Sequence, residues 1–351
     1  MPAHMGASAM KIYAAFVNIL PVVAFVVSAA SSSSTNSIDD MSTAVLIRVD
    51  LSGRGDFKTI QDAIDSVPSN NSELVFIWVK PGTYSREKIV VPADKPFITV
   101  SGTQPSNTII TSSDGGEIYE TATFTVLATD FVARFLTIKN TYGSAGKAVA
   151  LRVSADRAAF YGCSITSYQD TLLDDIGKHY YSNCYIEGAT DFIFGNAASL
   201  FEKCHVHTLF KSNGYPAQIT AQGRQSPSEN TGFTFLGCKI TGNGTAVLGR
   251  PWGAYSKVVY AFTYMSSVVV PAGWDDWGDN SKHSTVFYGE FKNYGPGADR
   301  SQRVLWSRNL SNDEAAVFMT KDVIGGKDWL RPAPKNFKRG TTTIAVNTDG
   351  N

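Results

Sequence analysis

The chain has 351 residues, of which 43% are apolar and 18% charged, and its formal net charge at pH 7 is zero. This balance argues against a nucleic-acid-binding protein, in which basic residues normally dominate. It does not exclude a protein that binds an acidic polymer, since a neutral protein can have a basic groove. The length fits either two domains or one continuous repetitive core.

The N-terminal segment predicts export. Ile12–Val27 is an apolar run followed by the small residues Ser28-Ala29-Ala30, as in a signal peptide with its cleavage site. Pro21 within the run argues against a membrane anchor. We predict a signal peptide over residues 1–30, a linker over residues 31–42, and a secreted, extracellular protein of the cell wall with no membrane segment after cleavage.

Export would also permit N-glycosylation. Three sequons are present, at Asn70-Asn71-Ser72, Asn243-Gly244-Thr245 and Asn309-Leu310-Ser311. We therefore expect a glycoprotein.

The first regular element predicted is a short helix over Thr59–Val67. Ile60, Ala63 and Ile64 recur on one helical face, and Pro68 closes the segment. Such a helix is suited to cap the open end of a solenoid, whose first coil otherwise exposes apolar surface and strand edges.

Short β-strands separated by Pro, Gly and Asn turns come next. No long helical pattern interrupts them, which argues against a doubly wound α/β sheet. The strands predicted are Leu74–Val79, Ile89–Val91, Phe97–Val100, Asn107–Ile110, Phe124–Leu127, Phe131–Ile138, Ala148–Val153, Gln218–Gln222, Gly232–Leu236 and Val258–Thr263.

A four-residue string, x-Cys-x-[Ile/Val], repeats through the middle of the chain. Its cysteines are Cys163, Cys184, Cys204 and Cys238, so the gaps are 184 − 163 = 21, 204 − 184 = 20 and 238 − 204 = 34 residues. The last gap leaves room for a coil with an enlarged loop. A period near 20 built from short strands predicts an all-β fold, a parallel β-helix. Residues one period apart then lie above one another, about 4.8 Å apart.

The same stacking brings two cysteines together. Cys184 and Cys204 lie one coil apart, and export favours disulfide bonds. We predict a disulfide between these two residues and leave Cys163 and Cys238 free.

The periodicity fades beyond Pro271–Trp277. We predict loops and one or two short helices that fold back along the solenoid, which gives one catalytic domain over residues 43–335. Residues 336–351 are polar and rich in Thr and Gly, so we predict a flexible tail there.

Two aspartates in apolar surroundings share the repeat period. They occur in Gln169-Asp170-Thr171-Leu172 and in Asp191-Phe192-Ile193-Phe194-Gly195, and 191 − 170 = 21 residues separate them. A carboxylate in apolar sequence is costly unless it is paired or used. Stacking would place the two carboxyl groups roughly 5–7 Å apart.

Two close carboxyl groups do not both ionise readily, so one keeps its proton to a higher pH. An acid beside an anion suits glycoside hydrolysis or ester hydrolysis. Ester hydrolysis also needs donors for an oxyanion, and the amide of Gln169 fits that need, which favours an esterase without deciding the matter.

Gly-x-Ser-x-Gly and His-Glu-x-x-His are absent, and we predict neither a metal nor another cofactor.

Five segments together make the chain resemble the plant-type pectin methylesterases (pectinesterases), from Leu51 to about Pro334. These segments are Gly82-Thr83-Tyr84, Ala148-Val149-Ala150-Leu151, Gln169-Asp170-Thr171-Leu172, Asp191-Phe192-Ile193-Phe194-Gly195 and Leu248-Gly249-Arg250-Pro251-Trp252. Each is modest evidence alone, but all five in this order are specific.

The resemblance implies a right-handed parallel β-helix and an enzyme that removes methyl esters from the galacturonate chain of cell-wall pectin. It implies Asp191 as the nucleophile, Asp170 as the general acid/base and Gln169 as an oxyanion donor. It also implies that Arg250 pairs with the nucleophile and that Trp252 lines the sugar cleft. The family carries the disulfide proposed above between Cys184 and Cys204. Phe194 is a further candidate for the cleft, since it alternates with Phe192 along a strand.

This sequence departs from the family pattern at two places. Lys147 stands before Ala148-Val149-Ala150-Leu151, where the family usually has a glutamine that donates to the oxyanion. Gly-x-Tyr-x-Glu is one residue longer here, as Gly82-Thr83-Tyr84-Ser85-Arg86-Glu87. The alternative interpretation is therefore a pectin-binding relative of low activity. A polygalacturonase or pectate lyase is disfavoured by the absence of Gly-His-Gly and Arg-Ile-Lys strings and of a calcium-binding carboxylate cluster.

The resemblance extends to partners. It implies methyl-esterified pectin as substrate and proteinaceous pectinesterase inhibitors as partners. A solenoid with capped ends has no need to pair, so we expect a monomer. About ten residues separate the predicted signal peptide from the catalytic segment, and we expect no inhibitor-like pro-region.

Overall fold

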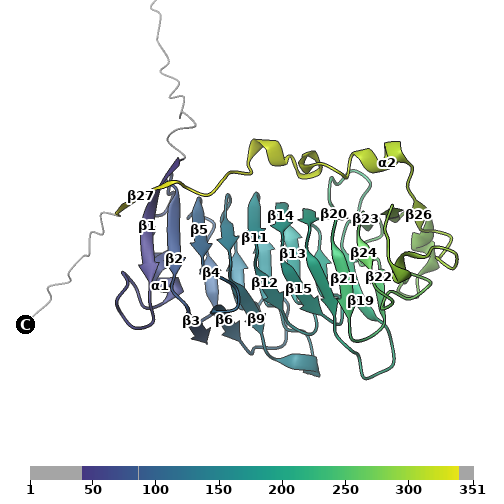
Figure 1. Cartoon of the computed structure of the whole chain (residues 1–351), viewed down its shortest axis with the longest axis horizontal. Coiled ribbons are helices and arrows are strands. Elements are labelled where there is room, and N and C mark those ends of the chain that lie inside the picture. The colour runs from purple at the N-terminus through teal and green to yellow at the C-terminus, as the bar shows by residue number, and fades with distance from the viewer. Residues whose placement is uncertain (1–41, 86, 340–351) are drawn as a thin grey trace, which may run out of the picture. The chain divides into compact units, whose positions relative to one another are not determined.

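The chain winds through three parallel β-sheets and contributes a strand to each in turn (Figure 1). The computed structural model describes residues 42–85 and 87–339. One coil consists of β11 (Ala158–Tyr161), β12 (Ser164–Thr166) and β13 (Leu172–Ile176), and each pairs in parallel with a strand of the next coil. The predicted right-handed parallel β-helix is confirmed.

We name the sheets A, B and C. Sheet A contains β11, β1 (Thr43–Val49), β2 (Val75–Val79), β5 (Ile98–Ser101), β8 (Val132–Arg134), β14 (Lys178–Ser182), β17 (Ala198–Glu202), β20 (Gly232–Leu236), β23 (Lys257–Ala261), β25 (Phe287–Phe291), β26 (Arg308–Asn309) and β27 (Asn336–Arg339).

Sheet B contains β12, β3 (Gly82–Ser85), β6 (Thr108–Ser112), β9 (Thr137–Asn140), β15 (Tyr185–Gly188), β18 (His205–Thr208), β21 (Lys239–Gly242) and β24 (Tyr264–Met265). Sheet C contains β13, β4 (Ile89–Val91), β7 (Phe124–Val126), β10 (Leu151–Ser154), β16 (Ile193–Gly195), β19 (Ala217–Gln222) and β22 (Ala246–Gly249).

The repeated string marks the turn from sheet A to sheet B. The residue before each cysteine has a positive φ, namely 58° at Gly162, 53° at Asn183, 54° at Lys203 and 62° at Gly237. One left-handed residue turns the chain sharply, and the residue after it points inward. Glycine adopts this conformation freely, which explains two of the four positions.

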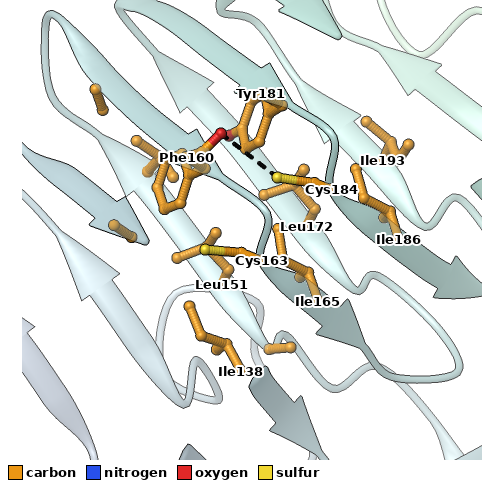
Figure 2. Close-up of a cluster of buried hydrophobic side chains, with 14 of the residues drawn as sticks. Ile138, Leu151, Phe160, Cys163, Ile165, Leu172, Tyr181, Cys184, Ile186 and Ile193 are labelled. Carbon is orange, nitrogen blue, oxygen red and sulfur yellow. Dashed lines mark hydrogen bonds between the residues drawn. The ribbon is translucent and has the colours of Figure 1, made fainter. Parts of the chain in front are cut away.

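Residues of similar type stack along the core. The rings of Phe160, Tyr181, Phe201, Phe235 and Tyr260 lie parallel on successive coils, with centroids 4.5–4.9 Å apart. Figure 2 shows the first two of these rings beside the sheet B column of Ile138, Ile165 and Ile186. Such ladders fix the register, because a slip of one residue would turn every buried side chain outward.

The predicted Cys184–Cys204 disulfide is wrong. All four cysteines are buried free thiols, and those of Cys184 and Cys204 lie 3.5 and 3.4 Å from the carbonyl oxygens of Phe160 and Tyr181 (Figure 2). Stacked residues in a parallel ladder point the same way, so their Cβ atoms keep the strand spacing of about 4.8 Å. A disulfide needs Cβ atoms about 3.8 Å apart.

The enlarged coil predicted between Cys204 and Cys238 is present. Its extra residues form two loops, residues 209–216 between β18 and β19 and residues 223–231 between β19 and β20. The preceding coil joins its corresponding strands with only residues 189–192 and 196–197. The longer loops leave the strand register unchanged.

The predicted N-terminal helix is present as α1 (Ile60–Asp65). Thr59 caps it by accepting a hydrogen bond from the Asp62 amide at 3.1 Å. Its face of Ile60, Ala63 and Ile64 is fully buried in the main core. Glu87 accepts a hydrogen bond from the Ile60 amide at 2.9 Å, which ties the lengthened Gly-x-Tyr segment to the start of the helix.

The C-terminal segment, yellow in Figure 1, returns along sheet A. After α2 (Asn312–Ala316) it forms the 3₁₀ turns η5 (Lys321–Ile324) and η6 (Gly326–Asp328). Ile324 packs on the outer face of sheet A with Tyr180 and Leu200. The remaining 3₁₀ turns are η2 (Gly143–Ala145), η3 (Asn280–Ser284) and η4 (Pro296–Ala298).

The prediction of a flexible tail from residue 336 is wrong for its first four residues. They form β27, which pairs in parallel with β1. The centroids of the Phe337 and Phe76 rings lie 5.1 Å apart, and Lys338 Nζ forms an ion pair with the Glu73 carboxylate at 2.5 Å. An edge strand offers unpaired backbone groups, and β27 satisfies those of β1.

The predicted signal peptide, nearly all of the predicted linker and residues 340–351 lie outside the described residues. Within the described part of the chain, no helix is long and apolar enough to span a membrane. The three sequon asparagines, Asn70, Asn243 and Asn309, are all exposed.

Candidate active site

Asp170 and Asp191 occupy the same position on adjacent coils of sheet C. Leu172 pairs with Ile193, and Gln169 bridges Thr190, so the two aspartates face each other across one strand spacing of about 4.8 Å. The structure thus brings together the two acidic residues singled out by their spacing.

Both aspartates have a left-handed backbone, with φ of 62° at Asp170 and 47° at Asp191. This conformation is uncommon for residues other than glycine, but aspartate and asparagine adopt it more readily than most. The chain turns here just before β13 and β16. Both side chains lie in largely buried positions, and the residues are only 6% and 8% exposed.

Arg250 binds Asp191 through two parallel hydrogen bonds. It follows β22, and its Nε and Nη2 donate to Oδ1 and Oδ2 of Asp191 at 2.7 and 2.6 Å. The ring of Trp277 covers the guanidinium, with its centroid 3.7 Å from Cζ. Such a bidentate, charge-assisted pair stabilises the ionised form of Asp191.

Asp170 has different surroundings. Burial, and next the neighbouring Asp191, raise its pKa, Lys147 and Arg250 lower it, and the net result is a pKa of about 7. Near neutral pH, Asp170 therefore holds a proton for much of the time while Asp191 is paired as an anion. One carboxyl group can donate a proton and the other can attack an electrophile.

Two candidate oxyanion donors lie on the Asp170 side of the pair. Gln169 is half-buried and accepts a backbone hydrogen bond from Ala148 at 3.1 Å. Lys147 directly precedes Ala148 and is exposed, and its positive charge lowers the pKa of Asp170. The loop of Lys147 is held by the Gly116 amide, which donates to the Lys147 carbonyl at 3.0 Å.

The aromatic candidates divide by exposure. Trp252 is 43% exposed and contacts Phe194, with ring centroids 6.0 Å apart. Phe194 is only 4% exposed and belongs to an apolar cluster with Leu173 and Ala221, separate from the main core that holds Phe192. Phe194 therefore supports Trp252 from below and exposes little surface of its own.

The structure adds three residues that sequence reasoning missed. Trp277, 42% exposed, comes from the segment where the periodicity fades. Lys211 and Gln218 lie beside Asp191, and the Lys211 ammonium donates to the Gln218 amide oxygen at 3.0 Å. The sequence placed Gln218 in a predicted strand. Because the loop before that strand is enlarged, the repeat period did not predict which residue of the preceding coil Gln218 pairs with.

Within the described residues, no three His, Cys, Asp or Glu side chains gather as a metal site would require. His205 and His207 instead both bond to the hydroxyl of Thr241, at 2.7 and 2.8 Å.

Comparison with known proteins agrees with this site. The family model for pectinesterases matches residues 46–327. "Putative pectinesterase 11" of Arabidopsis thaliana is 66% identical over 301 residues, which cover 85% of this chain and 84% of that protein. "Pectinesterase 31" of the same plant is 43% identical and covers 83% of this chain and 96% of that protein.

Solved structures show the same fold. The pectin methylesterase from carrot has a TM-score of 0.78 at 36% identity, covering 82% of this chain and 94% of that one. A pectin methylesterase in complex with a hexasaccharide has a TM-score of 0.69 at 26% identity, covering 83% and 98%. Taken with the matching family model, these relatives show that the chain is a member of the pectinesterase family, an enzyme that hydrolyses carboxylic esters.

Proposed function

We propose that this chain removes methyl esters from pectin with Asp191 as the nucleophile and Asp170 as the general acid and base. One observation supports these roles above all. Two stacked aspartates differ in state, since Arg250 holds Asp191 through two hydrogen bonds whereas the pKa of Asp170 is raised to about 7. Relatives named as pectin methylesterases, one of them solved with a hexasaccharide, support pectin as the substrate.

The reaction follows from these two states. A carboxylate oxygen of Asp191 attacks the ester carbonyl carbon, and Asp170 gives its proton to the leaving methoxide, which departs as methanol. Water then attacks the resulting anhydride between Asp191 and the sugar acid, and Asp170 takes a proton from that water. The products are methanol and a free galacturonate, and both aspartates return to their starting states.

The oxyanion needs donors while it exists. The Gln169 amide stands one residue before the acid and supplies one donor. The Lys147 ammonium takes the place of the usual second amide. Two observations support an active enzyme, since Arg250 binds Asp191 and the charge of Lys147 acts on Asp170. The alternative of a pectin-binding relative with low activity finds no support.

Two exposed indoles suit a sugar polymer. Trp252 and Trp277 are 43% and 42% exposed, and one rests on Phe194 while the other covers Arg250. Tryptophan offers a large rigid face against which a sugar ring can pack. We assign both to the walls of the sugar cleft, with Phe194 as the support of Trp252.

The remaining proposals concern the setting of the enzyme. The apolar run at residues 12–27 supports export to the cell wall, and the exposure of Asn70, Asn243 and Asn309 is compatible with glycosylation there. Proteinaceous pectinesterase inhibitors are proposed as partners on the strength of the family resemblance. A monomer is proposed as the working state because a solenoid with capped ends has no need to pair.

The test is methanol release from highly methylated pectin by the wild-type protein and by Asp191→Asn and Asp170→Asn. We expect each variant to lose about 10³-fold or more in kcat, because each removes a group that makes or breaks bonds. The matched control is Asp94→Asn, which should keep full activity. Asp94 is exposed and lies in the loop between β4 and β5.

The length of the pectin chains is measured in the same samples. Intact chains with methanol released support the esterase. Shortened chains, or normal rates in the two variants, would refute the proposal.

A further inference from the structure

The outer face of sheet B carries a row of aromatic and basic side chains on its later coils. The members of this sheet B row are paired in register on successive coils, and they are Tyr185, His205, Lys239, Tyr264 and Tyr294. In β15, β18, β21 and β24 the residue after the row member is buried, so alternation turns the row outward. The row therefore runs along the axis of the solenoid, with side chains about 4.8 Å apart.

The last members of the row border a groove of about 480 Å³. Lys239, Tyr264 and Tyr294 line this groove together with Thr241 and Ser266. The ring centroids of Tyr264 and Tyr294 lie 5.5 Å apart, the ring planes are inclined at 61°, and Tyr294 is 58% exposed. Each tyrosine offers an apolar ring face and a polar hydroxyl group, which suits the mixed surface of a sugar.

The groove also contains a hydroxyl group that lacks a partner. The Oγ atom of Ser266 is buried, and among the described residues it has no hydrogen-bond partner. Buried polar atoms are nearly always paired, because an unpaired one costs free energy. The hydroxyl groups of a sugar in the groove would supply the missing partner.

The charge of this face favours an acidic ligand. Lys203 and Lys239 are exposed, and no carboxylate of the described residues lies within ion-pair distance of either ammonium. Lys203 belongs to the same face, because its Cγ lies 3.9 Å from where a Cβ on Gly237 would stand, and Gly237 lines the groove. The carboxylate of Glu187, beside the row, accepts a hydrogen bond from the Tyr185 hydroxyl at 2.6 Å. The two ammonium groups are therefore available to donate to an anion.

A polymer of galacturonate combines sugar rings, hydroxyl groups and carboxylates. We propose that the sheet B row and its groove form a second pectin-binding site, on a different face from the catalytic aspartates of sheet C, for stretches of chain that have already lost their methyl esters. The tyrosines pack against sugar rings, and Lys203 and Lys239 pair with carboxylates. Binding at two places holds the enzyme on a long chain more tightly than the cleft alone. This inference rests on the proposed pectin demethylation.

The test compares long, partly methylated pectin with a methylated trigalacturonate, which is too short to occupy both faces at once. In Lys239→Gln and in Tyr294→Ala we expect KM for long pectin to rise about threefold to tenfold, while kcat and both constants for the trimer stay unchanged. Lys239→Arg keeps the charge and Tyr294→Phe keeps the ring, so each should retain most of the wild-type affinity for the polymer.

Affinity electrophoresis in gels that contain fully de-esterified polygalacturonate measures binding directly. The wild type should be retarded more than Lys239→Gln and Tyr294→Ala. The matched control is Lys178→Gln, an exposed lysine on β14 of sheet A, which should behave as the wild type in both assays.

Two results would overturn the second site and leave the proposed function intact. One is a wild-type KM for long pectin in both variants, and the other is an equal loss on polymer and trimer, which a damaged fold would give. Failure of the wild-type protein to release methanol from either substrate overturns the proposed function itself.

Discussion

Asp170 and Asp191 share one backbone conformation and one place in the repeat, yet their surroundings give them opposite tasks. The difference comes from residues far away in sequence. Arg250 reaches Asp191 from a coil two strands further on, and Lys147 acts on Asp170 from the coil before it. Burial and Asp191 raise the pKa of Asp170, and Lys147 offsets part of that rise. The catalytic asymmetry therefore comes mainly from Arg250, which gives its two hydrogen bonds to Asp191 alone.

Replacing Lys147 by glutamine should shift the pH dependence of the enzyme. Lys147 holds the pKa of Asp170 down, so without it that pKa rises. Since the first chemical step needs a protonated Asp170, the alkaline limb of kcat/KM should move to higher pH. kcat itself should change by less than about tenfold, because an amide also donates to an oxyanion.

The measurement is the pH–rate profile of methanol release. Lys178→Gln, an exposed lysine at the start of β14, serves as the control and should leave the profile in place. An alkaline limb that stays fixed in Lys147→Gln would show that Lys147 does not act on the general acid.

Asp170→Asn should stabilise the fold at alkaline pH while it abolishes activity. The folded protein keeps the Asp170 proton up to about pH 7, whereas the unfolded chain releases it near pH 4. The free energy of unfolding of the wild type therefore falls as pH rises from about 4 to about 7, and asparagine removes that loss. Asparagine also tolerates the left-handed backbone.

We expect the free energy of unfolding of Asp170→Asn, relative to that of the wild type, to increase by about 2 kcal/mol from pH 5 to pH 8. Urea unfolding at the two pH values measures it. Asp94→Asn should show no such pH-dependent gain. A constant difference between Asp170→Asn and wild type at both pH values would contradict the raised pKa.

The sequence indicated the residues whose places are fixed by the repeat or by short motifs. Asp170 and Asp191 follow from the period, and Arg250 and Trp252 from one motif. Trp277, Lys211 and Gln218 were missed because their positions depend on long loops, whose paths the period does not determine. The role of Phe194 was not visible, since strict alternation would give it the same face as Phe192. Phe192 precedes β16 and lies in the main core, whereas Phe194 lies in a separate cluster beside Trp252.

At the level of single elements, the ring ladder inside sheet A helps to fix the register of its strands. Phe201 is fully buried between Tyr181 and Phe235, with ring centroids 4.6 and 4.5 Å away. Phe201→Ala should lower the free energy of unfolding by about 3–5 kcal/mol, because it leaves a cavity between two rings that cannot close the gap.

Phe210→Ala is the matched control. The Phe210 ring is 60% exposed, so its removal should cost less than about 1 kcal/mol. Chemical denaturation of both variants checks the pair. Equal losses would mean that the ladder adds nothing beyond ordinary packing at the surface.

The elements also show where sequence reasoning reached its limit. Most strands were predicted where each coil repeats the last, and α1 was predicted from its apolar face and Pro68. The single strand predicted over Phe131–Ile138 is wrong, because a left-handed Phe135 (φ 53°) divides it into β8 and β9. The disulfide was wrong because stacking gives proximity without the convergence of Cβ atoms that a bond between Cys184 and Cys204 needs. β27 was missed because a polar segment pairs through its backbone, which composition does not reveal.

On the scale of the whole described chain, the C-terminal segment links coils that are far apart. Ile324 packs on strands in the middle of sheet A, and β27 pairs with the first strand. A solenoid whose coils contact only their neighbours can fray from either end. The returning segment couples the ends to the middle.

Phe337→Ala should loosen the first coil selectively. It removes the ring contact with Phe76 and weakens the pairing of β27 with β1. We expect a loss of about 1 kcal/mol in overall stability, and backbone amides of β1 that exchange with solvent about tenfold faster. Hydrogen exchange followed by mass spectrometry measures this, with the amides of β20 as the internal reference. Unchanged exchange in β1 would contradict a stabilising role for β27.

The pairing of β27 with β1 has a consequence for the order of events during synthesis. β27, the strand that pairs with β1, leaves the ribosome after every other described strand. Until then β1 presents a bare edge of the kind that recruits other strands. A nascent chain thus exposes the edge of β1 until β27 has been made, so products truncated before β27 should aggregate more readily than their length alone would suggest.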